Sequence, residues 1–329
     1  MNDIEREEFW KVLLNAKNEG DVDKLKMKIK YPNMLYRYRS INIKTLNALA
    51  ENKLFFSTSN YYDDPFDTFI RIDIKQVKNI AQRLETGDIP PILINMFHSI
   101  PNPNFTKENI NIILNNVIDF AKEARSEIRK WIWSLCFTEK YYNETLWLKY
   151  ANNHRGFVLA YDINALNNAV LNTEPSALCM VNNSVNFPLY PMYYSKDEKS
   201  YDATNYAGFI ALCYFLEKTG NNSIIQILSS QGNCMWEMER IMLIKKWIHR
   251  YDEEWRMILN SKYRIDDIAK PCIICKPSKV ILGLRMADED KKAVLMASEI
   301  AGINSIEQMI INDNDKFVSK NLYHVKDNT

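Results

Sequence analysis

The stretch "NMLYRYRSINIKTLNALAENKLFFSTSNYYDDPFD" (residues 33–67) decides the expected fold of this chain. Its first eight residues are rich in apolar and aromatic side chains and predict a strand. "INIKTLNALAEN" then places apolar residues at helical spacing, and "KLFFSTS" predicts a second strand. These three segments predict a compact strand-helix-strand unit that carries arginine on one strand and Ser-Thr-Ser at the end of the next.

The remaining sequence mixes helix and strand signals on both sides of this unit. Residues 1–31 predict two short helices, and segments at about 71–130 and 203–248 predict helical insertions. Further strands are predicted in "WIWSLCFT" (131–138), "GFVLAYD" (156–162), "PLYPMYYS" (188–195), "EEWRMILN" (253–260), "CIICKPSKVILGL" (272–284) and "KFVSKNLYHV" (316–325). Because no steady βαβ rhythm is present, residues 32–329 predict one α+β domain with a mixed or antiparallel sheet.

Composition excludes several classes of function. The 329 residues are 47% hydrophobic, enough for a sizeable core, yet no apolar run is long enough to span a membrane. The acidic amphipathic N-terminus does not resemble a signal peptide, and six cysteines fit reduced thiols, so we expect a cytoplasmic protein. The net charge of +1 offers no global field for a polyanion. Neither G-x-G-x-x-G nor G-x-x-x-x-G-K-[ST] occurs, which disfavours a Rossmann site or a P-loop.

Two short motifs raise the possibility of a metal site. "CIIC" (272–275) is the only C-x-x-C, and the four histidines are too isolated to complete a zinc site, so no metal is expected. Asp63, Asp64 and Asp67 could hold a divalent cation if another acid joined them. The favoured interpretation is a turn, in which Asp64 caps the backbone and Phe66 packs underneath.

Two later motifs could carry chemistry. In "RYDEEWRMIL" (250–259), strand alternation would put Asp252 and Glu254 on one face, poised to bind sugar hydroxyls or to stabilise a cation. An exposed strand end explains these acids equally well. Trp147 and Tyr150 lie on one face of a predicted helix that could wall a cleft, with His154 at the following turn. The default interpretation of the two aromatic residues is core packing. The default interpretation of His154 is a turn or capping role.

Four segments together resemble a large bacterial family of unknown-function domains, some of which occur in abortive-infection phage defence. They are "LYRYRSINIKTLNALAENKLFFSTSNYYDDPFD", "SLCFTEKYYNETLWLKYANNHRGFVLAYD", "YDEEWRMIL" and "SKVILGLRMADEDKKAV". The family usually has Glu where this chain has Asp252, and Asn where it has Asp63. The order Arg, Ser-Thr-Ser and Glu-x-Glu also resembles, more distantly, the NAD-dependent ADP-ribosyltransferases.

The more distant resemblance implies a split sheet with NAD between its two halves. In that arrangement Arg37 or Arg39 would bind the NAD phosphates or adenosine ribose, Glu254 would stabilise the oxocarbenium ion, and Asp252 would orient the incoming nucleophile. Ser57 and Ser59 would orient the nicotinamide ribose. Other residues expected to contribute to the NAD site are Tyr38, Thr58, Asp64, Trp147, Tyr150 and His154.

The resulting expectation is a toxin-like, anti-phage ADP-ribosyltransferase that consumes NAD and modifies a macromolecule. "IRKWIW" and "KKWIHR" place aromatic residues beside basic ones, which favours RNA or DNA slightly over protein as the acceptor. An inhibitory antitoxin is an expected partner, since a potent effector needs restraint. Two alternatives remain open at this point: a metal-dependent nuclease using Asp64, Asp67 and Glu254, and a non-catalytic sensor or interaction module.

Overall fold

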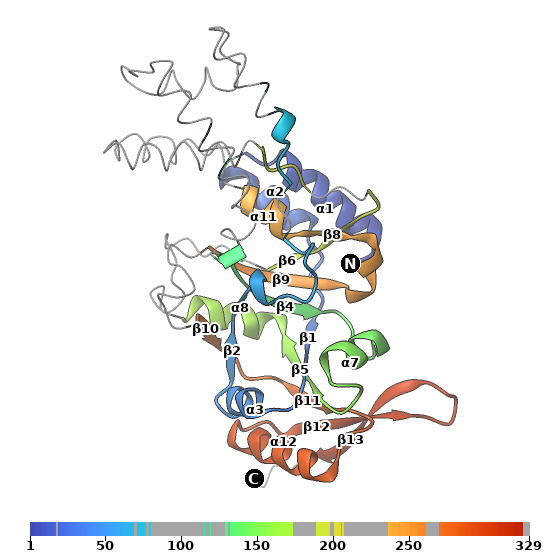
Figure 1. The fold of residues 1–329 in the computed structure, drawn as a ribbon. Coiled ribbons are helices and arrows are strands. Elements are labelled where there is room, and N and C mark those ends of the chain that lie inside the picture. The colour runs from blue at the N-terminus through green and yellow to red at the C-terminus, as the bar shows by residue number, and fades with distance from the viewer. Residues whose placement is uncertain are drawn as a thin grey trace.

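The computed structural model describes residues 1–17, 19–68, 71–76, 79, 115, 119, 129–130, 132–173, 189–197, 201–204, 206, 236–260 and 270–324. Within these residues, nine strands form one sheet in the order β13-β12-β11-β5-β1-β4-β9-β6, with β3 beside β4 (Figure 1). Their bounds are β1 Met34–Arg39, β3 Ser57–Thr58, β4 Ile132–Thr138, β5 Phe157–Asp162, β6 Leu189–Pro191, β9 Glu254–Asn260, β11 Lys279–Leu282, β12 Ser305–Ile311 and β13 Phe317–His324.

The sheet is mixed, which confirms the expected α+β class. β11 and β12 pair in parallel, and the helix α12 (Asp288–Ile300) connects them. The other pairings in this sheet are antiparallel. Two small ribbons complete the strands: antiparallel β2 (Lys53–Phe55) with β10 (Cys272–Ile274), and parallel β7 (Tyr193–Ser195) with β8 (Ile244–Lys246).

The sheet is weakly joined at its centre. β1 pairs with β5 along its whole length, and β4 pairs with β9 from Ile132 to Thr138. In contrast, β1 and β4 meet at one residue pair, Tyr36 with Thr138. Farther along the same edge of β4, β3 pairs with Trp133 and Ser134. Among the described residues, the part of β4 between these contacts has no strand neighbour on that edge, so a gap opens between β1 and β3.

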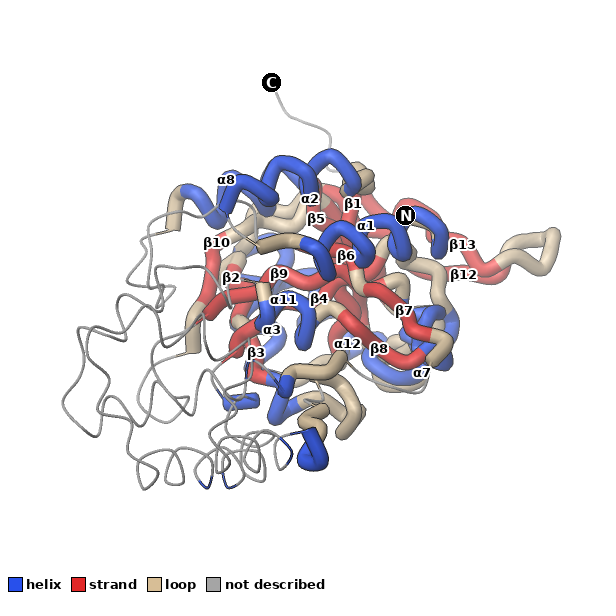
Figure 2. The backbone as a smooth tube through the Cα atoms, turned by 90° about the horizontal axis from the view of Figure 1, so that it is seen from above, coloured by secondary structure: helices blue, strands red, loops and turns tan. Residues whose placement is uncertain are grey.

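Helices gather at both ends of the molecule (Figure 1). At one end are α1 (Asp3–Asn15), η1 (Glu19–Asp21), α2 (Val22–Lys28) and α11 (Glu237–Met242); at the other are α3 (Ile43–Ala50) and α12, which pack together. Elsewhere lie η2 (Ser59–Tyr61), α7 (Glu144–Tyr150), α8 (Ile163–Leu171) and η3 (Trp247–Asp252). The β12–β13 hairpin projects from the body (Figure 2).

Local sequence signals explain where several of these helices begin. The Asn2 side chain accepts from the backbone N–H of Glu5, whose carboxylate accepts from the N–H of Asn2, a capping box that starts α1. Asn42 and Thr45 cap α3 in the same reciprocal way. The predicted helix between β1 and β2 is therefore present, but it begins at Ile43, two residues after the start of the predicted segment.

The main core is built around the centre of the sheet. Trp133, Trp255, Phe56 and Phe157 are fully buried within it. Tyr38, Trp147 and Met309 belong to a second, smaller buried cluster beside α7. Trp133 of β4 lies in the main core, and Tyr38 of β1 lies in the smaller one. Buried apolar contacts therefore hold the strands that border the gap.

Two predictions of secondary structure were wrong. The predicted strand 272–284 is divided into β10 and β11, which lie in different sheets. β12 was not predicted, because its buried Ile306 and Met309 are three residues apart, a spacing that resembles a helix. The described part of the mostly helical segment 203–248 contains α11 and also the short strand β8. Most of the predicted insertion at 71–130, and much of 203–248, lies outside the described residues.

Candidate active site

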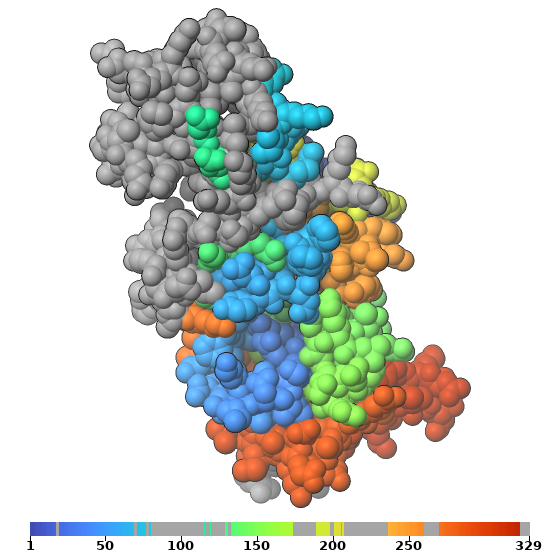
Figure 3. Space-filling model, in the orientation of Figure 1, coloured from blue at the N-terminus to red at the C-terminus, as the bar shows by residue number. Residues whose placement is uncertain are grey.

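The gap between β1 and β3 is the floor of an open cleft of about 210 Å³. In Figure 3 the surface is hollowed between the blue residues near α3 and the green residues of α7. The cleft is lined by Tyr36, Arg37, Tyr38, Arg39, Ser57, Tyr61, Tyr62, Asp63, Asp64, Asp67, Ser134, Cys136, Phe137, Thr138, Leu146, Lys149, Tyr150, Lys245, His249, Asp252, Glu254 and Arg256. Its charged lining residues come from β1, α7, β8, η3, β9 and the segment after η2.

 

The strand β1 contributes two arginines to the cleft. Arg37 and Arg39 are two residues apart, so both point to the same face of β1. Arg37 is 8% exposed, and its Nη1 has no hydrogen-bond partner among the described residues, while Nη2 donates to the Phe55 carbonyl at 3.5 Å. Arg39 is half-buried, and no carboxylate of the described residues lies beside it. The cleft therefore holds two guanidinium groups that have no anionic partner in the part of the chain that the structure describes.

Burial and mutual repulsion act on this arginine pair. Burial lowers the pKa of Arg37, and burial together with the charge of Arg37 lowers the pKa of Arg39 to about 9. Arg39 remains protonated at pH 7, because its lowered pKa lies above that pH; a guanidinium such as that of Arg37 is not deprotonated in proteins. Buried charges in proteins are usually paired or hydrogen-bonded. An anionic ligand would supply the missing partner for both arginines.

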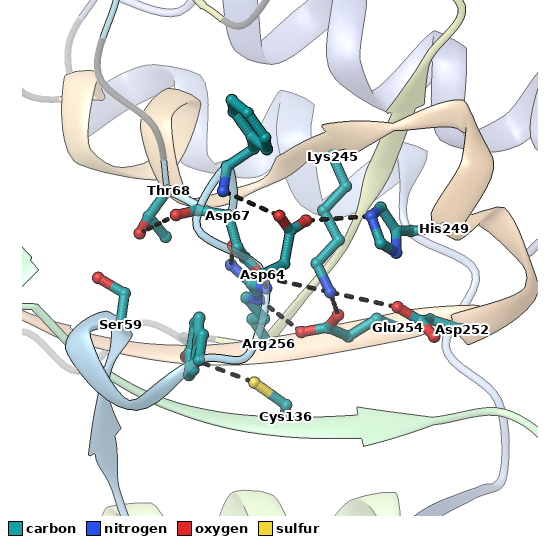
Figure 4. Close-up of polar contacts among 12 residues, drawn as sticks. Ser59, Asp64, Asp67, Thr68, Cys136, Lys245, His249, Asp252, Glu254 and Arg256 are labelled. Carbon is teal, nitrogen blue, oxygen red and sulfur yellow. Dashed lines mark hydrogen bonds and ion pairs between the residues drawn. The ribbon is translucent and has the colours of Figure 1, made fainter. Parts of the chain in front are cut away.

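On the other side of the cleft, five charged side chains form one buried network (Figure 4). The Lys245 ammonium pairs with Glu254, and lies 3.2 Å from carboxylate oxygens of Asp67 and Asp252. The Arg256 Nε donates to Glu254 at 2.6 Å, and its two amino groups bind both oxygens of Asp67 at 2.8 and 2.5 Å. With all five groups ionised, the network carries a net charge of −1.

The two acids of the candidate site have different environments. Burial opposes ionisation of Glu254, but Arg256 and Lys245 outweigh it and hold its pKa well below the usual range. Burial raises the pKa of Asp252, and Lys245 offsets only part of that effect. One oxygen of Asp252, Oδ1, is buried without a hydrogen-bond partner among the described residues. Glu254 is therefore a fixed anion, whereas Asp252 retains an oxygen that can accept a proton.

Asp252 and Glu254 come together by a different route from the one predicted. Asp252 ends η3, and Glu254 begins β9. Between them Glu253 adopts the left-handed conformation with φ 42°, so the alternation of an extended strand does not apply. The ammonium of Lys245 instead bridges the two carboxylates, and both line the cleft. The predicted proximity is present, although the predicted strand geometry was wrong.

The Ser-Thr-Ser segment contributes one side chain to the cleft. Ser57 lines it from β3. Thr58 and Ser59 are fully buried and do not belong to the lining, and the Ser59 hydroxyl donates to the Arg129 carbonyl at 3.4 Å. Strand alternation explains the separation of Ser57 from Thr58. Ser59 is turned away because η2 begins there.

The segment after η2 forms the predicted turn and also reaches the cleft. The Asp64 carboxylate accepts from the Phe66 N–H at 2.8 Å, which confirms its capping role, and pairs with His249 at 3.0 Å. Phe66 does not pack underneath the turn, because 52% of it is exposed and Lys246 lies over its ring. Asp67 is drawn into the buried network by Arg256.

The structure divides the aromatic candidates into two groups. Tyr38 and Tyr150 line the cleft. Trp147 is fully buried in the smaller core, where its indole N–H donates to the Tyr141 carbonyl at 2.7 Å. The ring of His154 stacks on Trp147 rather than lining the cleft. Trp147 and His154 thus pack behind the residues that line the cleft.

Sequence reasoning missed Lys245 and Arg256, which hold both acids in place. Arg256 could have been found, because it lies two residues after Glu254 and therefore on the same face of a predicted strand. Lys245 gave no such signal, since its segment was predicted to be part of a helical insertion. His249 was likewise treated as isolated, although it pairs with an acid 185 positions away in sequence.

 

Comparisons with known proteins find no relative of this chain. No family model matches it, and neither the curated proteins nor the solved structures contain a match. No described helix has both the length and the apolar character needed to cross a membrane. The function must therefore be argued from the geometry of the cleft.

Proposed function

We propose that this protein is an NAD-dependent ADP-ribosyltransferase that transfers ADP-ribose to a macromolecule. The observation that carries the proposal is the composition of the cleft. It combines a buried arginine with an unpartnered Nη1, Arg37, and a buried carboxylate that is held ionised, Glu254. A ligand that suits both groups has an anionic part and a part that becomes positively charged during the reaction.

NAD has both parts. Its pyrophosphate carries negative charge and offers several acceptor oxygens, which match the forked donors of Arg37 and Arg39. The sugar next to nicotinamide becomes an oxocarbenium-like cation when the glycosidic bond breaks. The aromatic wall, including Tyr38, Phe137 and Tyr150, offers flat apolar surface for a ring system.

The fixed charge of Glu254 would act at the bond-breaking step. The bond between C1′ and the nicotinamide nitrogen breaks, and its electron pair leaves with nicotinamide, which becomes neutral. Positive charge then develops on the sugar, where the network around Glu254 supplies a net charge of −1 in a buried setting. Lys245 and Arg256 hold the carboxylate in one position, so little reorganisation is needed as charge develops.

Asp252 would serve the incoming nucleophile. An acceptor hydroxyl or amine must lose a proton as it bonds to C1′, and the unpartnered Oδ1 of Asp252 can take that proton. Burial raises the pKa of Asp252, which makes it a stronger base than an exposed aspartate. Ser57, which faces the same cleft, is placed to bind a ribose hydroxyl.

The size of the cleft limits how much NAD it can enclose. Its volume of about 210 Å³ lies below the ~300–1,000 Å³ typical of sites that bury a drug-sized ligand. The reacting nicotinamide ribose would occupy the cleft, and the adenosine half would extend from it. Such an arrangement leaves the reacting carbon near the surface, as transfer to a large acceptor requires.

The metal-dependent nuclease fits the cleft less well. Each of its three carboxylates already has a protein partner: Asp64 contacts the His249 imidazole, Asp67 pairs with Arg256, and Glu254 pairs with Lys245 and Arg256. A metal ion would have to displace these partners. The nuclease predicts a nucleic-acid cleavage activity that is abolished by EDTA and does not depend on NAD.

The biological role is a separate part of the proposal. A toxin-like defence effector, restrained by an antitoxin, is suggested by the resemblance to the family linked to abortive infection. A non-catalytic sensor would also retain the buried network as a structural feature. The sensor predicts that Glu254→Gln leaves a defence phenotype unchanged, whereas the transferase predicts its loss.

The test uses NAD labelled on its adenylate phosphate. Purified protein is incubated with this NAD and a cell lysate, and the products are divided between nuclease and protease treatments. Label that becomes attached to macromolecules with the wild type, but not with Glu254→Gln, supports the transferase and identifies its acceptor class. If neither attached label nor free nicotinamide is found, the proposal is wrong.

A further inference from the structure

The rim of the cleft carries a repeated pairing of aromatic rings with cations. Lys270 lies 4.9 Å from the ring centroid of Tyr61, Lys246 lies 4.0 Å from that of Phe66, and Lys149 lies 4.9 Å from that of Tyr150. Tyr61, Tyr150 and Lys149 line the cleft themselves. Phe66 lies between the lining residues Asp64 and Asp67 in sequence, and Lys246 follows the lining residue Lys245.

A fourth pair continues this band beyond the rim. Arg250 directly follows the lining residue His249, and its guanidinium lies 4.9 Å from the ring centroid of Trp247. Within the described residues, none of the four cations of the band forms an ion pair with a carboxylate; each lies over a ring instead. Two of the four rings are more than half exposed, Tyr61 at 62% and Phe66 at 52%.

We infer that this band binds single-stranded nucleic acid, which is then the acceptor of the proposed transferase. A single strand offers unpaired bases that stack on aromatic rings, and one phosphate per nucleotide that attracts a cation. The band supplies both partners four times, at three pairs by the cleft and at a fourth beyond its rim. This inference rests on the proposed function for the role of acceptor, but binding itself requires no NAD.

The charge distribution favours a polyanion over a protein acceptor. The chain as a whole has a net charge of only +1, so the four cations of the band, which have no carboxylate partner among the described residues, and the two arginines of β1 are a local concentration of positive charge. Double-stranded nucleic acid keeps its bases stacked inside the helix, where these rings could not reach their faces. A flexible single strand can place a base on each ring and one nucleotide in the cleft.

The first experiment measures binding without NAD. Fluorescence anisotropy with a labelled twelve-nucleotide single strand, as RNA and as DNA, should show binding that weakens with salt. For four phosphate contacts, the logarithm of the association constant should fall with a slope of about −3 against the logarithm of salt concentration. Lys149→Gln and Lys270→Gln should each reduce that slope by about 0.7. Lys320→Gln, an exposed lysine on the distant β13, is the matched control and should leave it unchanged.

The second experiment separates stacking from charge. Tyr61→Ala and Phe66→Ala remove exposed rings without changing charge, and each should weaken binding to the single strand by roughly 5- to 100-fold. A duplex of the same length should bind more weakly and be insensitive to both changes. If the single strand does not bind, or if the aromatic variants bind it as the wild type does, the inference is wrong.

The outcomes also distinguish this inference from the proposed function. Nicotinamide release from NAD that depends on Glu254, without any binding of single strands, would overturn the nucleic-acid acceptor and leave the NAD-cleaving site in place. Attachment of label to protein of the lysate, and not to nucleic acid, would likewise overturn the nucleic-acid acceptor and leave the NAD-cleaving site in place. Binding of single strands that depends on the band, without nicotinamide release, would support the surface and overturn the transferase.

Discussion

Lys245 and Glu254 form a buried ion pair at the base of the cleft, and they come from two different strands, β8 and β9. The lysine also approaches Asp67 and Asp252, so a single ammonium group balances three carboxylates together with Arg256. Removal of one member of such a network leaves buried charge without compensation, which is more costly than the loss of an exposed pair. The cleft and the stability of the domain are therefore linked through Lys245.

Lys245→Met should lower the free energy of unfolding by about 3–5 kcal/mol, because three carboxylates lose their shared cation. Urea denaturation followed by circular dichroism measures this change. Lys246→Met is the matched control: its side chain is partly exposed and lies over Phe66, so a change within about 0.5 kcal/mol is expected. If Lys245→Met and Lys246→Met lowered the free energy of unfolding by the same amount, the network would not be what stabilises the fold.

The contribution of Glu254 should depend on pH in a defined direction. Its pKa in the folded protein is lowered, so its contribution is present above about 4.3, the ordinary pKa of glutamate, and is lost as the pH falls toward the folded pKa. At pH 7, Glu254→Gln should lower the free energy of unfolding by about 1.5–3 kcal/mol. The difference between variant and wild type should narrow between pH 5 and pH 3; a constant difference would contradict the lowered pKa.

Arg37→Met should weaken NAD binding without weakening the fold. The arginine is buried with Nη1 unpartnered, so its removal relieves a desolvation cost, and the free energy of unfolding should stay the same or rise. Loss of its charged contact with phosphate should weaken binding by roughly 10- to 150-fold, as measured by isothermal titration calorimetry. Arg155→Met removes an exposed arginine near β5 and should change neither quantity. A destabilised Arg37 variant with normal NAD binding would assign the arginine to the fold alone.

Gly156→Ala should disturb the strand that carries both arginines. A Cβ at this position would lie 2.1 Å from the backbone oxygen of Arg39, so β1 and β5 would have to move apart. We expect a loss of about 1–3 kcal/mol in unfolding free energy, which is typical of overpacking. Thermal denaturation measures the loss, and an unchanged melting temperature would show that the strands yield without cost.

The sequence predicted those parts of the site that depend on local pattern. Arg37 and Arg39 share a strand face because the spacing of two is a property of any strand, and Asp64 caps its turn through a contact two residues away. The contacts of Lys245 with Asp67 and of Arg256 with Asp67 join positions far apart in the chain. No local periodicity encodes such contacts, so they could be found only once the strands were placed.

The central claim is that Glu254 drives cleavage of NAD, and nicotinamide release tests it most directly. Release from NAD is measured by liquid chromatography for the wild type, Glu254→Gln and Glu253→Gln, after circular dichroism has shown that each is folded. Glu253 is the matched control, because it is adjacent and pairs with Lys140 rather than with the buried network. Glu254→Gln should lose at least about 100-fold in nicotinamide release, and Glu253→Gln should release it at a nearly normal rate. Equal release by the two variants, or none by the wild type, would contradict the claim that Glu254 drives cleavage of NAD.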